Sequence, residues 1–293
     1  MLKIAVIANA KSRTNDGWAS CETLVRGRPN MEVYILGESP LDDIVKQAWA
    51  RGCKTIVAAG GDGTISSVAD ALVRLQIPVR LGILPIGTLN HFAKDLQIPL
   101  DVTDALDVIE SGHSTEIDVA KVNGRYFINN SSVGLYPYLL KKRQGLKRRT
   151  VYTKLGLLYA FISVFLRRFF FEVTFGKRAD LVAKKTMGIF IGNNKYITEG
   201  FDIGTRPKLN QGTLFVLILK RVHVLQVLIL FYKIFRGTAL EDDNVNVVGL
   251  EECSIDSKKR RILVSYDGEV SSMIPPLHYS VVPKALSVIV PHL

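Results

Sequence analysis

Residues 60–64 read Gly60-Gly61-Asp62-Gly63-Thr64, the most informative motif for the fold of the first part of this chain. It follows an apolar run at residues 54–59, which predicts a strand, and precedes a helical pattern at residues 65–75. A glycine-rich turn between a strand and a helix lets backbone N–H groups approach phosphate oxygens, and the helix N-terminus adds partial positive charge there. Asp62 would repel a bare phosphate, so it indicates a magnesium ion or an oriented hydroxyl. A purely structural strand-to-helix turn is the alternative.

The first third of the chain alternates strand-like and helical patterns. Strands are expected at residues 3–8, 31–36, 54–59 and 79–84, and helices at residues 41–51, 65–75, 89–96 and 102–110. Apolar strands joined by helices predict a doubly wound α/β domain with a parallel sheet. Ligands of such folds bind beyond the carboxyl ends of the strands. Both the glycine turn (residues 60–64) and the loop at residues 85–90, here called the second loop, fall at that edge, so we expect them to share one site.

From about residue 114 the pattern becomes that of an antiparallel β-sandwich or barrel. Alternating runs at residues 115–122 and 125–129 flank Asn123-Gly124, a pair that favours a tight hairpin turn. Further strands are expected at residues 169–175, 186–192, 213–219, 245–250, 260–266 and 277–282, and a last run at residues 285–290 is expected to return to the first domain. We therefore expect an α/β nucleotide-binding domain at residues 1–113 plus 284–293, and a β-sandwich substrate domain at residues 114–283.

The composition is that of a folded globular protein, with 47% apolar and 22% charged residues. The formal net charge of +11 predicts an anionic partner, either a nucleotide, a nucleic acid or an acidic membrane surface. A nucleic-acid partner is not expected, because no recognised binding motif accompanies the charge. The three cysteines are far apart and lack metal-ligand spacing, and the N-terminus resembles a strand rather than a signal peptide, so a cytoplasmic protein is expected.

Two stretches interrupt the second domain. Residues 141–149 are rich in Lys and Arg, and apolar residues recur at helical spacing in residues 150–171 and 222–235. The longest uncharged apolar run, residues 155–166, would rise only about 18 Å as a helix, too little to cross a bilayer core of about 30 Å. One interpretation is an interfacial element attracted to anionic lipid, which predicts peripheral membrane association. The alternative is a core helix beside a solvated basic loop.

Several motifs follow one another in a specific order along nearly the whole chain. They are Asn9 after the first strand, the glycine turn, Pro85-Ile86-Gly87-Thr88-Leu89-Asn90-His91-Phe92-Ala93-Lys94, Ile117-Asp118-Val119 and Asp267-Gly268-Glu269. The chain resembles the soluble bacterial diacylglycerol kinase-like lipid kinases, which are relatives of sphingosine and ceramide kinases. The resemblance implies an NAD kinase/diacylglycerol kinase-like fold with a cleft between two domains. It also implies a role in lipid metabolism, through ATP- and Mg²⁺-dependent phosphate transfer to a lipid hydroxyl. A homodimer is left open.

The resemblance also implies roles for individual residues. The nucleotide would be contacted by Asn9, Gly60, Gly61, Asp62, Gly63, Thr64, Ser66, Ser67, Gly87, Thr88 and Asn90. Asp62 and Asp118 are the candidates for holding catalytic Mg²⁺, although Asp118 could instead be a buried strand aspartate that accepts backbone hydrogen bonds. Lys94 could neutralise phosphate charge or simply be solvated.

The resemblance places the general base in Asp267-Gly268-Glu269. Residues two apart on a strand face the same way, so we expect Asp267 and Glu269 to form a pair of acids. Such a pair can divide its work, one carboxylate taking the substrate proton while the other stays ionised and orients. Glu269 is slightly favoured as the base. An Asp-Gly turn followed by an exposed glutamate is the alternative.

Four positions depart from the family pattern. The family usually has Asn-Asp-Phe where this chain has Asn90-His91-Phe92, and an imidazole cannot replace the charge of a carboxylate. The family's structural metal loop resembles Lys-Leu-Asp-Asp-Gly, but residues 208–212 read Lys-Leu-Asn-Gln-Gly, so no structural metal is expected there. The first-strand motif and the end of the second strand also differ. Two other functions therefore stay open, an NAD kinase-type small-molecule kinase and a nucleotide- or lipid-binding protein with weakened catalysis.

Overall fold

The structure, a computed structural model, describes residues 3–10, 17–147, 171–175, 180–184, 186–197, 205–220 and 245–292. The chain divides into two compact units. Unit 1 comprises Met1–Val119, Gly124–Ile128 and Val282–Leu293, and unit 2 comprises Ala120–Asn123 and Asn129–Val281. Among the described residues, no helix combines the length and the apolar character needed to cross a membrane.

Unit 1 is built on a parallel sheet. Its strands run in the order β2 (Met31–Ile35), β1 (Ile4–Ala8), β3 (Thr55–Gly60) and β4 (Arg80–Pro85). Val288, near the end of β16 (Leu277–Ile289), pairs in parallel with Leu81 of β4. Every residue of β1 and β3 is buried, as expected where helices cover both faces of a parallel sheet. The four predicted strands of this sheet are confirmed to within about one residue at each end.

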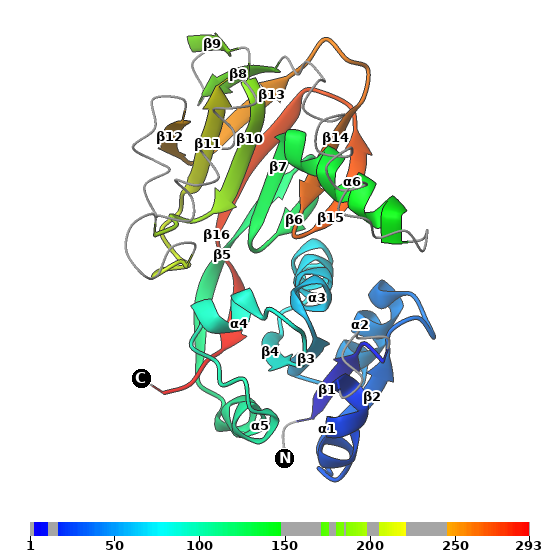
Figure 1. The fold of residues 1–293 in the computed structure, drawn as a ribbon. Helices are drawn as coiled ribbons and strands as arrows, with labels where there is room; N and C mark the ends of the chain where they lie inside the picture. Colours follow the sequence, from blue (N-terminus) through cyan, green and yellow to red (C-terminus); the bar gives the residue numbers. More distant parts are fainter. Residues whose placement is uncertain are drawn as a thin grey trace. The chain divides into compact units, whose positions relative to one another are not determined.

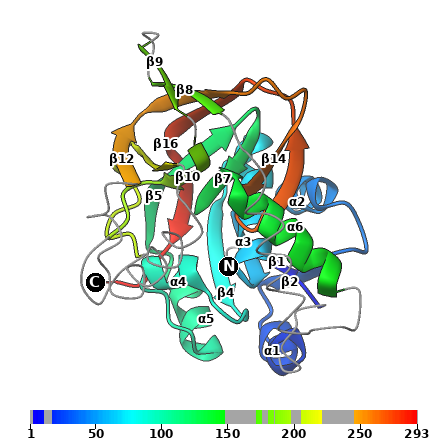
Figure 2. The same cartoon turned by 45° about the horizontal axis from the view of Figure 1, so that its top comes forward.

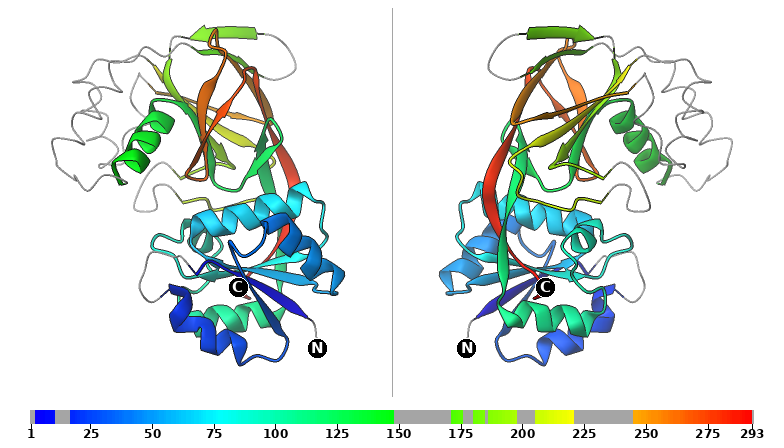
Figure 3. Two further views of the ribbon diagram at one scale, coloured as in Figure 1. Left: turned by 90° about the vertical axis from the view of Figure 1, so that its right-hand side faces the viewer. Right: turned by 90° about the vertical axis from the view of Figure 1, so that its left-hand side faces the viewer.

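Helices lie on both faces of this sheet. Figure 3 shows α1 (Gly17–Arg26) and α5 (Val102–Ser111) on one face, and α2 (Leu41–Ala50) and α3 (Asp62–Arg74) on the other. The short helix α4 (His91–Asp95) follows the second loop. Helix α5 has clear signals at both ends: Asp101 accepts hydrogen bonds from the N–H groups of Thr103 and Asp104, and Gly112 is left-handed with φ 75°. Helix α1 was not predicted.

Helix α3 begins at Asp62, three residues before the predicted start at residue 65. Gly61 is its N-cap, in extended conformation, and Asp62, Gly63 and Thr64 form the first turn. The prediction began too late because glycine is a poor helix former in a helix interior. The first turn tolerates glycine better, because its N–H groups have no intrahelical partner to lose. The glycine turn is therefore itself the N-terminus of a helix.

Unit 2 is antiparallel. One sheet has the order β12 (Val245–Leu250), β11 (Leu214–Lys220), β10 (Thr186–Asn193), β7 (Asn130–Gly134), β14 (Ile262–Tyr266) and β15 (Glu269–Met273). In the second layer β13 (Glu252–Asp256) lies between the first residues of β16 and β8 (Phe171–Phe175), which pairs with β9 (Asp180–Lys184). Figures 1 and 2 show β7 between β10 and β14. The expected β-sandwich is confirmed.

Two long strands take part in both units. Strand β5 (Ser114–Val122) forms a hairpin with β6 (Arg125–Phe127), and both turn residues, Asn123 (φ 44°) and Gly124 (φ 82°), are left-handed, as the Asn-Gly pair predicts. Strand β16 was predicted as two strands with a break after residue 282. It is one strand, and Lys284, with φ 51°, marks the irregular point where the break was expected.

Several elements of unit 2 were missed. Helix α6 (Leu135–Lys147) covers most of the basic stretch, which one of the two interpretations placed in a solvated loop. Strand β7 reads Asn-Ser-Ser-Val-Gly, which has too few β-branched or aromatic residues to indicate a strand, and β9, β13 and β15 are each only five residues long. The predicted helical segment at residues 222–235 and most of that at 150–171 lie outside the described residues, as do residues 148 and 149.

Candidate functional site

The glycine turn and the second loop touch each other in unit 1. A Cβ atom added to Gly87 would lie 2.3 Å from the Cα atom of Gly61 and 2.7 Å from Oδ1 of Asn90. Outside their own residue and its chain neighbours, real Cβ atoms essentially never come within 3.0 Å of another heavy atom, so only glycine fits at this crossing. The two loops follow neighbouring strands, with Gly60 of β3 beside Pro85 of β4. The sequence argument that both loops end at one edge of the sheet is thus correct.

Side chains from two segments, the end of β1 and the first turns of α3, fix the glycine turn. Asn9, at the end of β1, donates from Nδ2 to Oγ1 of Thr64 over 3.1 Å. Thr64 is buried against Gly60, where an added Cβ would lie 2.4 Å from the same hydroxyl oxygen. Ser67 donates its hydroxyl to the Gly63 carbonyl at 2.8 Å, and Ser66 is buried. Gly63 is the exposed residue of the turn, so solvent reaches the first turn of α3 at that position.

Asp62 joins the glycine turn to helix α4. Its Oδ1 accepts a hydrogen bond from the backbone N–H of Phe92 at 3.1 Å, and so satisfies a donor in the first turn of that helix. His91, the first residue of α4, is exposed. Lys94 is also exposed, which agrees with its interpretation as a solvated lysine and leaves the phosphate role untested. Asp62 therefore has a structural contact in addition to any role toward a ligand.

Asn90 closes the second loop on itself. It is buried and left-handed, with φ 50°. Its Oδ1 accepts from the Gly87 N–H at 3.1 Å, and its Nδ2 donates to the carbonyls of Pro85 at 3.0 Å and Gly87 at 2.9 Å. The loop keeps its shape through this side chain, while Thr88 at its tip is exposed. Asn90 was predicted to contact nucleotide, and the structure gives its amide a loop-building role.

Asp118 lies in unit 1 on β5. It is 1% exposed, and its Oδ1 accepts the N–H of Lys284 at 2.9 Å, at the irregular point of β16. This is the contact that the alternative interpretation of Asp118 describes, a buried strand aspartate that holds backbone. Within the described residues, no group of three or more His, Cys, Asp or Glu side chains gathers into a metal cage.

Asp267 and Glu269, in unit 2, do not share a strand face as expected. Asp267 (φ 44°) and Gly268 (φ 85°) form the left-handed turn between β14 and β15, so Glu269 begins a new strand opposite Tyr266. The prediction was wrong because it extended one strand through an Asp-Gly pair that favours a tight turn. Oδ1 of Asp267 accepts the N–H groups of Asn129 at 2.9 Å and Asn130 at 3.0 Å. Glu269 is exposed.

A buried polar cluster supports the segment that holds this turn, and sequence reasoning missed it. Arg206 is 2% exposed and donates to Oδ1 of Asn129 at 2.7 Å and to the Asn193 carbonyl at 3.2 Å. Its guanidinium carbon lies 5.4 Å from the centre of the Tyr196 ring. The Tyr196 hydroxyl donates to the Asn129 carbonyl at 3.0 Å. An arginine between a Thr and a Pro carries no sequence signal of burial, so only the structure identifies the cluster.

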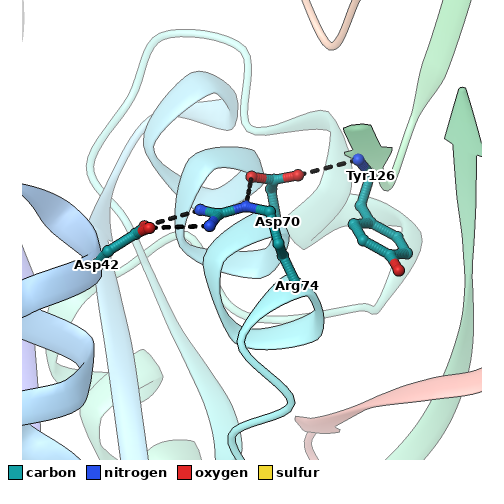
Figure 4. A network of polar contacts seen from close by, with 4 residues as sticks. All are labelled: Asp42, Asp70, Arg74 and Tyr126. Carbon is teal, nitrogen blue, oxygen red and sulfur yellow. Dashed lines mark hydrogen bonds and ion pairs between the residues drawn. The ribbon is translucent and has the colours of Figure 1, made fainter. Parts of the chain in front are cut away.

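A second network fixes the far part of α3 (Figure 4). Arg74 binds Asp42 of α2 through two nitrogens, at 2.7 and 2.8 Å, and contacts Asp70 through Nε at 3.2 Å. Asp70 in turn accepts the N–H of Tyr126 in β6 at 2.9 Å. The hydrogen bond from Arg74 holds the pKa of the Asp42 carboxyl below its ordinary value. Helices α2 and α3 and strand β6 are thereby tied together within unit 1.

Two protein families match the two parts of this chain. Residues 3–122, which include the glycine turn, the second loop and Asp118, match the family described as "Diacylglycerol kinase catalytic domain". Residues 165–290 match the family described as "YegS C-terminal NAD kinase beta sandwich-like domain". Each of the two parts of the chain is thus similar to a domain of the diacylglycerol kinase-like proteins.

Curated relatives include proteins named diacylglycerol kinase from Staphylococcus aureus strains JH9 and Newman. Each is 40% identical over 99 residues, which cover 34% of this chain and 31% of the relative. The match thus spans about a third of the length of those relatives. Solved structures titled as a diacylglycerol kinase and a putative diacylglycerol kinase, both from Bacillus anthracis str. Sterne, cover 99% of this chain and 97% of their own, with TM-scores of 0.69 and 0.72 and identities of 21% and 23%. These structural likenesses concern the fold.

The resemblance implies two positions for a metal ion, a catalytic one at Asp62 and Asp118 and a structural one in the loop at residues 208–212, and they differ in the ligands they offer. Mg²⁺ is commonly held by one or two carboxylates together with substrate phosphates, so it does not require a full protein cage. Asp62, on the partly exposed glycine turn, has the chemistry of such a ligand, whereas Asp118 is 1% exposed and accepts the Lys284 N–H. The loop at residues 208–212 does not suit a hard cation. There Gln211 uses its Oε1 to accept the Lys195 N–H at 3.2 Å, and its own N–H donates to Oδ1 of Asn194 at 2.9 Å. Side-chain amides hold this loop in place of carboxylates.

Proposed function

We propose that this protein is a lipid kinase that transfers the γ-phosphate of ATP to a hydroxyl of a diacylglycerol-like lipid, with Mg²⁺. The observation that carries the proposal is the contact of Gly61 with Gly87, which sets the second loop against the N-terminus of α3. Phosphates are favoured at such a helix end by its N–H groups and its dipole. The matching catalytic-domain family supports ATP rather than another anion as the ligand.

In this proposal the nucleotide phosphates contact the backbone of Gly61, Gly63, Gly87 and Thr88. Asn9, Gly60, Thr64, Ser66 and Ser67 act mainly by fixing the turn, and Asn90 by shaping the second loop. Residues 1–113 with 284–293 are proposed as the nucleotide-binding domain and residues 114–283 as the lipid domain. Because the backbone is already fixed, binding does not have to order it, which reduces the entropic cost.

Asp62 and Asp118 are the proposed ligands of Mg²⁺, which would neutralise charge on the transferring phosphate. Asp62 uses Oδ1 for the Phe92 N–H, and a carboxylate has further lone pairs on both oxygens for a cation or its water. Glu269 is proposed as the base that takes the hydroxyl proton, because it is exposed. Oδ1 of Asp267 accepts two backbone N–H groups, so Asp267 would orient the turn.

Peripheral association with an anionic membrane is part of the proposal, because a diacylglycerol-like substrate resides in a bilayer. Lys141, at the start of the basic stretch, is exposed on α6, and the net charge of +11 suits such a surface. A homodimer stays a prediction.

The test is transfer of ³²P from γ-labelled ATP to diacylglycerol, monoacylglycerol, phosphatidylglycerol, sphingosine, ceramide and NAD. We expect labelling of a glycerolipid. Labelling of NAD alone would favour a small-molecule kinase, and ATP binding without turnover on any acceptor would favour a protein with weakened catalysis.

Asp62→Asn gives the sharper test of the site. The amide keeps an oxygen that can accept the Phe92 N–H, so the fold and Tm should be nearly unchanged while turnover falls by about 100-fold or more. Asp43→Asn is the matched control, because Asp43 is an exposed acid in the first turn of α2. If Asp62→Asn keeps near wild-type turnover, Asp62 does not hold the metal.

A further inference from the structure

Four consecutive cations form the turn between β13 and β14 of unit 2, both labelled in Figure 1. They are Lys258, Lys259, Arg260 and Arg261, here called the basic turn, and all four are exposed. This turn lies outside the basic stretch at residues 141–149, and the proposed chemistry does not use it. It is a dense display of positive charge, with Asp256 as the acidic neighbour in sequence.

The backbone that carries these cations is held in a defined shape. The Ser257 N–H donates to Oδ1 of Asp256 at 2.7 Å, and the Lys259 N–H donates to Oγ of Ser257 at 3.3 Å. No ion pair between described residues joins Lys258, Arg260 or Arg261 to a carboxylate. The turn therefore presents its charges to solvent from a fixed base, which reduces the entropy lost on binding.

An exposed aliphatic side chain lies at the same end of unit 2. Strand β13 pairs its Ile255 with Leu277, and β14 pairs its Ile262 with Met273. The turn at residues 257–261 and the turn at residues 274–276 therefore join the same two strand pairs at the same end. Ile274 in the second of these turns is 57% exposed.

The backbone around Ile274 is anchored as well. Asn123 donates from Nδ2 to the carbonyls of Pro276 at 3.1 Å and Ile274 at 3.5 Å. The Ile274 side chain is thus held outward at an end of the sandwich that also carries the basic turn. Cations beside an exposed aliphatic group are the combination by which peripheral proteins bind a membrane surface, with charges at the headgroups and the apolar group between acyl chains.

We propose that this end of unit 2, the basic turn with Ile274, contacts the surface of an anionic phospholipid bilayer. The role of this contact rests on the proposed function, since membrane binding would bring a lipid kinase to a substrate that resides in the bilayer. Nucleic acid is the less suitable partner. Single strands are bound through aromatic side chains on which bases stack, and the exposed side chain here is aliphatic.

The experiment is sedimentation with vesicles of phosphatidylcholine containing 30 mol% phosphatidylglycerol, compared with pure phosphatidylcholine, without ATP. Each basic residue near an anionic surface changes the partition coefficient by roughly fivefold. The triple variant K258Q/R260Q/R261Q should therefore lose at least tenfold in partition coefficient. Ile274→Ser should weaken binding severalfold. Binding of the wild type should fall as salt rises, because salt screens the charges.

The matched control is K3Q/K46Q/K54Q, which removes three exposed lysines of unit 1. It has the same net charge as the first triple variant and should keep binding within about twofold. Equal loss in both triple variants would mean that only net charge matters and would overturn the proposal. So would equal binding to both vesicle types. If K258Q/R260Q/R261Q loses binding to single-stranded poly(U) but keeps binding to vesicles, the basic turn binds nucleic acid instead.

A second measurement separates this proposal from the proposed function. Phosphotransfer to a water-soluble, short-chain diacylglycerol in the absence of vesicles should be unchanged in K258Q/R260Q/R261Q. If the wild type phosphorylates no lipid but the vesicle results hold, the kinase assignment fails and the membrane contact stands. If the triple variant loses short-chain turnover and keeps vesicle binding, the basic turn serves the reaction rather than the membrane.

Discussion

Gly87→Ala should separate the two loops of the candidate site. The added methyl carbon would lie 2.3 Å from the Cα atom of Gly61. Carbon atoms in contact lie about 3.5–4.0 Å apart, so the two backbones must move apart by about 1 Å or more. Neither neighbour can yield easily, because Gly61 is the N-cap of α3 and Asn90 is held by three hydrogen bonds.

The magnitude follows from that displacement. Overpacking of this kind costs about 1–3 kcal/mol of stability, which corresponds to a fall in Tm of roughly 2–10 °C. A misplacement of about 1 Å at a site of reaction can reduce the rate by about 100-fold. We therefore expect Gly87→Ala to weaken ATP binding by about tenfold or more and to depress phosphotransfer further.

Gly63→Ala is the control for the steric effect on stability alone, because Gly63 belongs to the proposed phosphate-contacting backbone. No heavy atom lies within 4 Å of a Cβ at Gly63, and the residue is helical. Alanine should leave stability unchanged or raise it by up to about 1 kcal/mol. Calorimetry for Tm and titration with ATP measure both effects. If Gly63→Ala weakens ATP binding without lowering Tm, the phosphates pack against the helix N-terminus.

The reasoning is refuted if Gly87→Ala has the Tm and the ATP affinity of the wild type. The loops would then have room that the structure does not show. A fall in Tm with unchanged ATP affinity would remove the second loop from the nucleotide site while keeping the steric argument.

Arg74→Gln should lower the free energy of unfolding by about 1–2 kcal/mol, because it removes a bidentate ion pair that is only partly exposed. Arg26→Gln, at an exposed ion pair within one helix, should lower it by about 0.5 kcal/mol or less. Thermal unfolding distinguishes the two variants. Arg74 lowers the pKa of Asp42 below its ordinary value of 3.8. The stability that this ion pair contributes is therefore present above about pH 4 and is lost as the pH falls through the lowered pKa. The difference in stability between the wild type and Arg74→Gln should shrink only in that acid range. His91→Asp should lower the Mg²⁺ concentration for half-maximal turnover, because a carboxylate would stand next to Phe92, whose N–H binds Asp62. Unchanged Mg²⁺ dependence in that variant would place His91 away from the metal.

Local sequence signals predicted unit 1 well. Apolar runs indicated β1 to β4, and helical periodicity indicated α2, α3 and α5. These signals suffice because a parallel sheet covered on both faces requires continuous apolar strands. Helix α1 was not predicted, although Asp16 before it is a residue type favoured at helix N-caps and Trp18, Cys21 and Val25 recur at helical spacing.

Unit 2 was harder, because its short strands are defined by their partners. Ser131 and Ser132 do not suggest a strand, yet they are buried in β7 between β10 and β14. Their hydroxyls bond to the carbonyl and the hydroxyl of Ser265, which makes burial tolerable. Such pairs are distant in sequence, so no local pattern shows them.

The fold class, the resemblance to the diacylglycerol kinase-like proteins and the glycine turn could all be predicted from residue order, because the spacing of glycines and apolar residues reflects backbone requirements that hold for any neighbour. The folded chain was needed to see that Gly87 meets Gly61, that Asp62 accepts the Phe92 N–H of α4, and that Asp267 holds the backbone of Asn129 and Asn130. These contacts join segments far apart along the chain. Their existence depends on distances that the folded backbone sets, and residue type alone does not encode them.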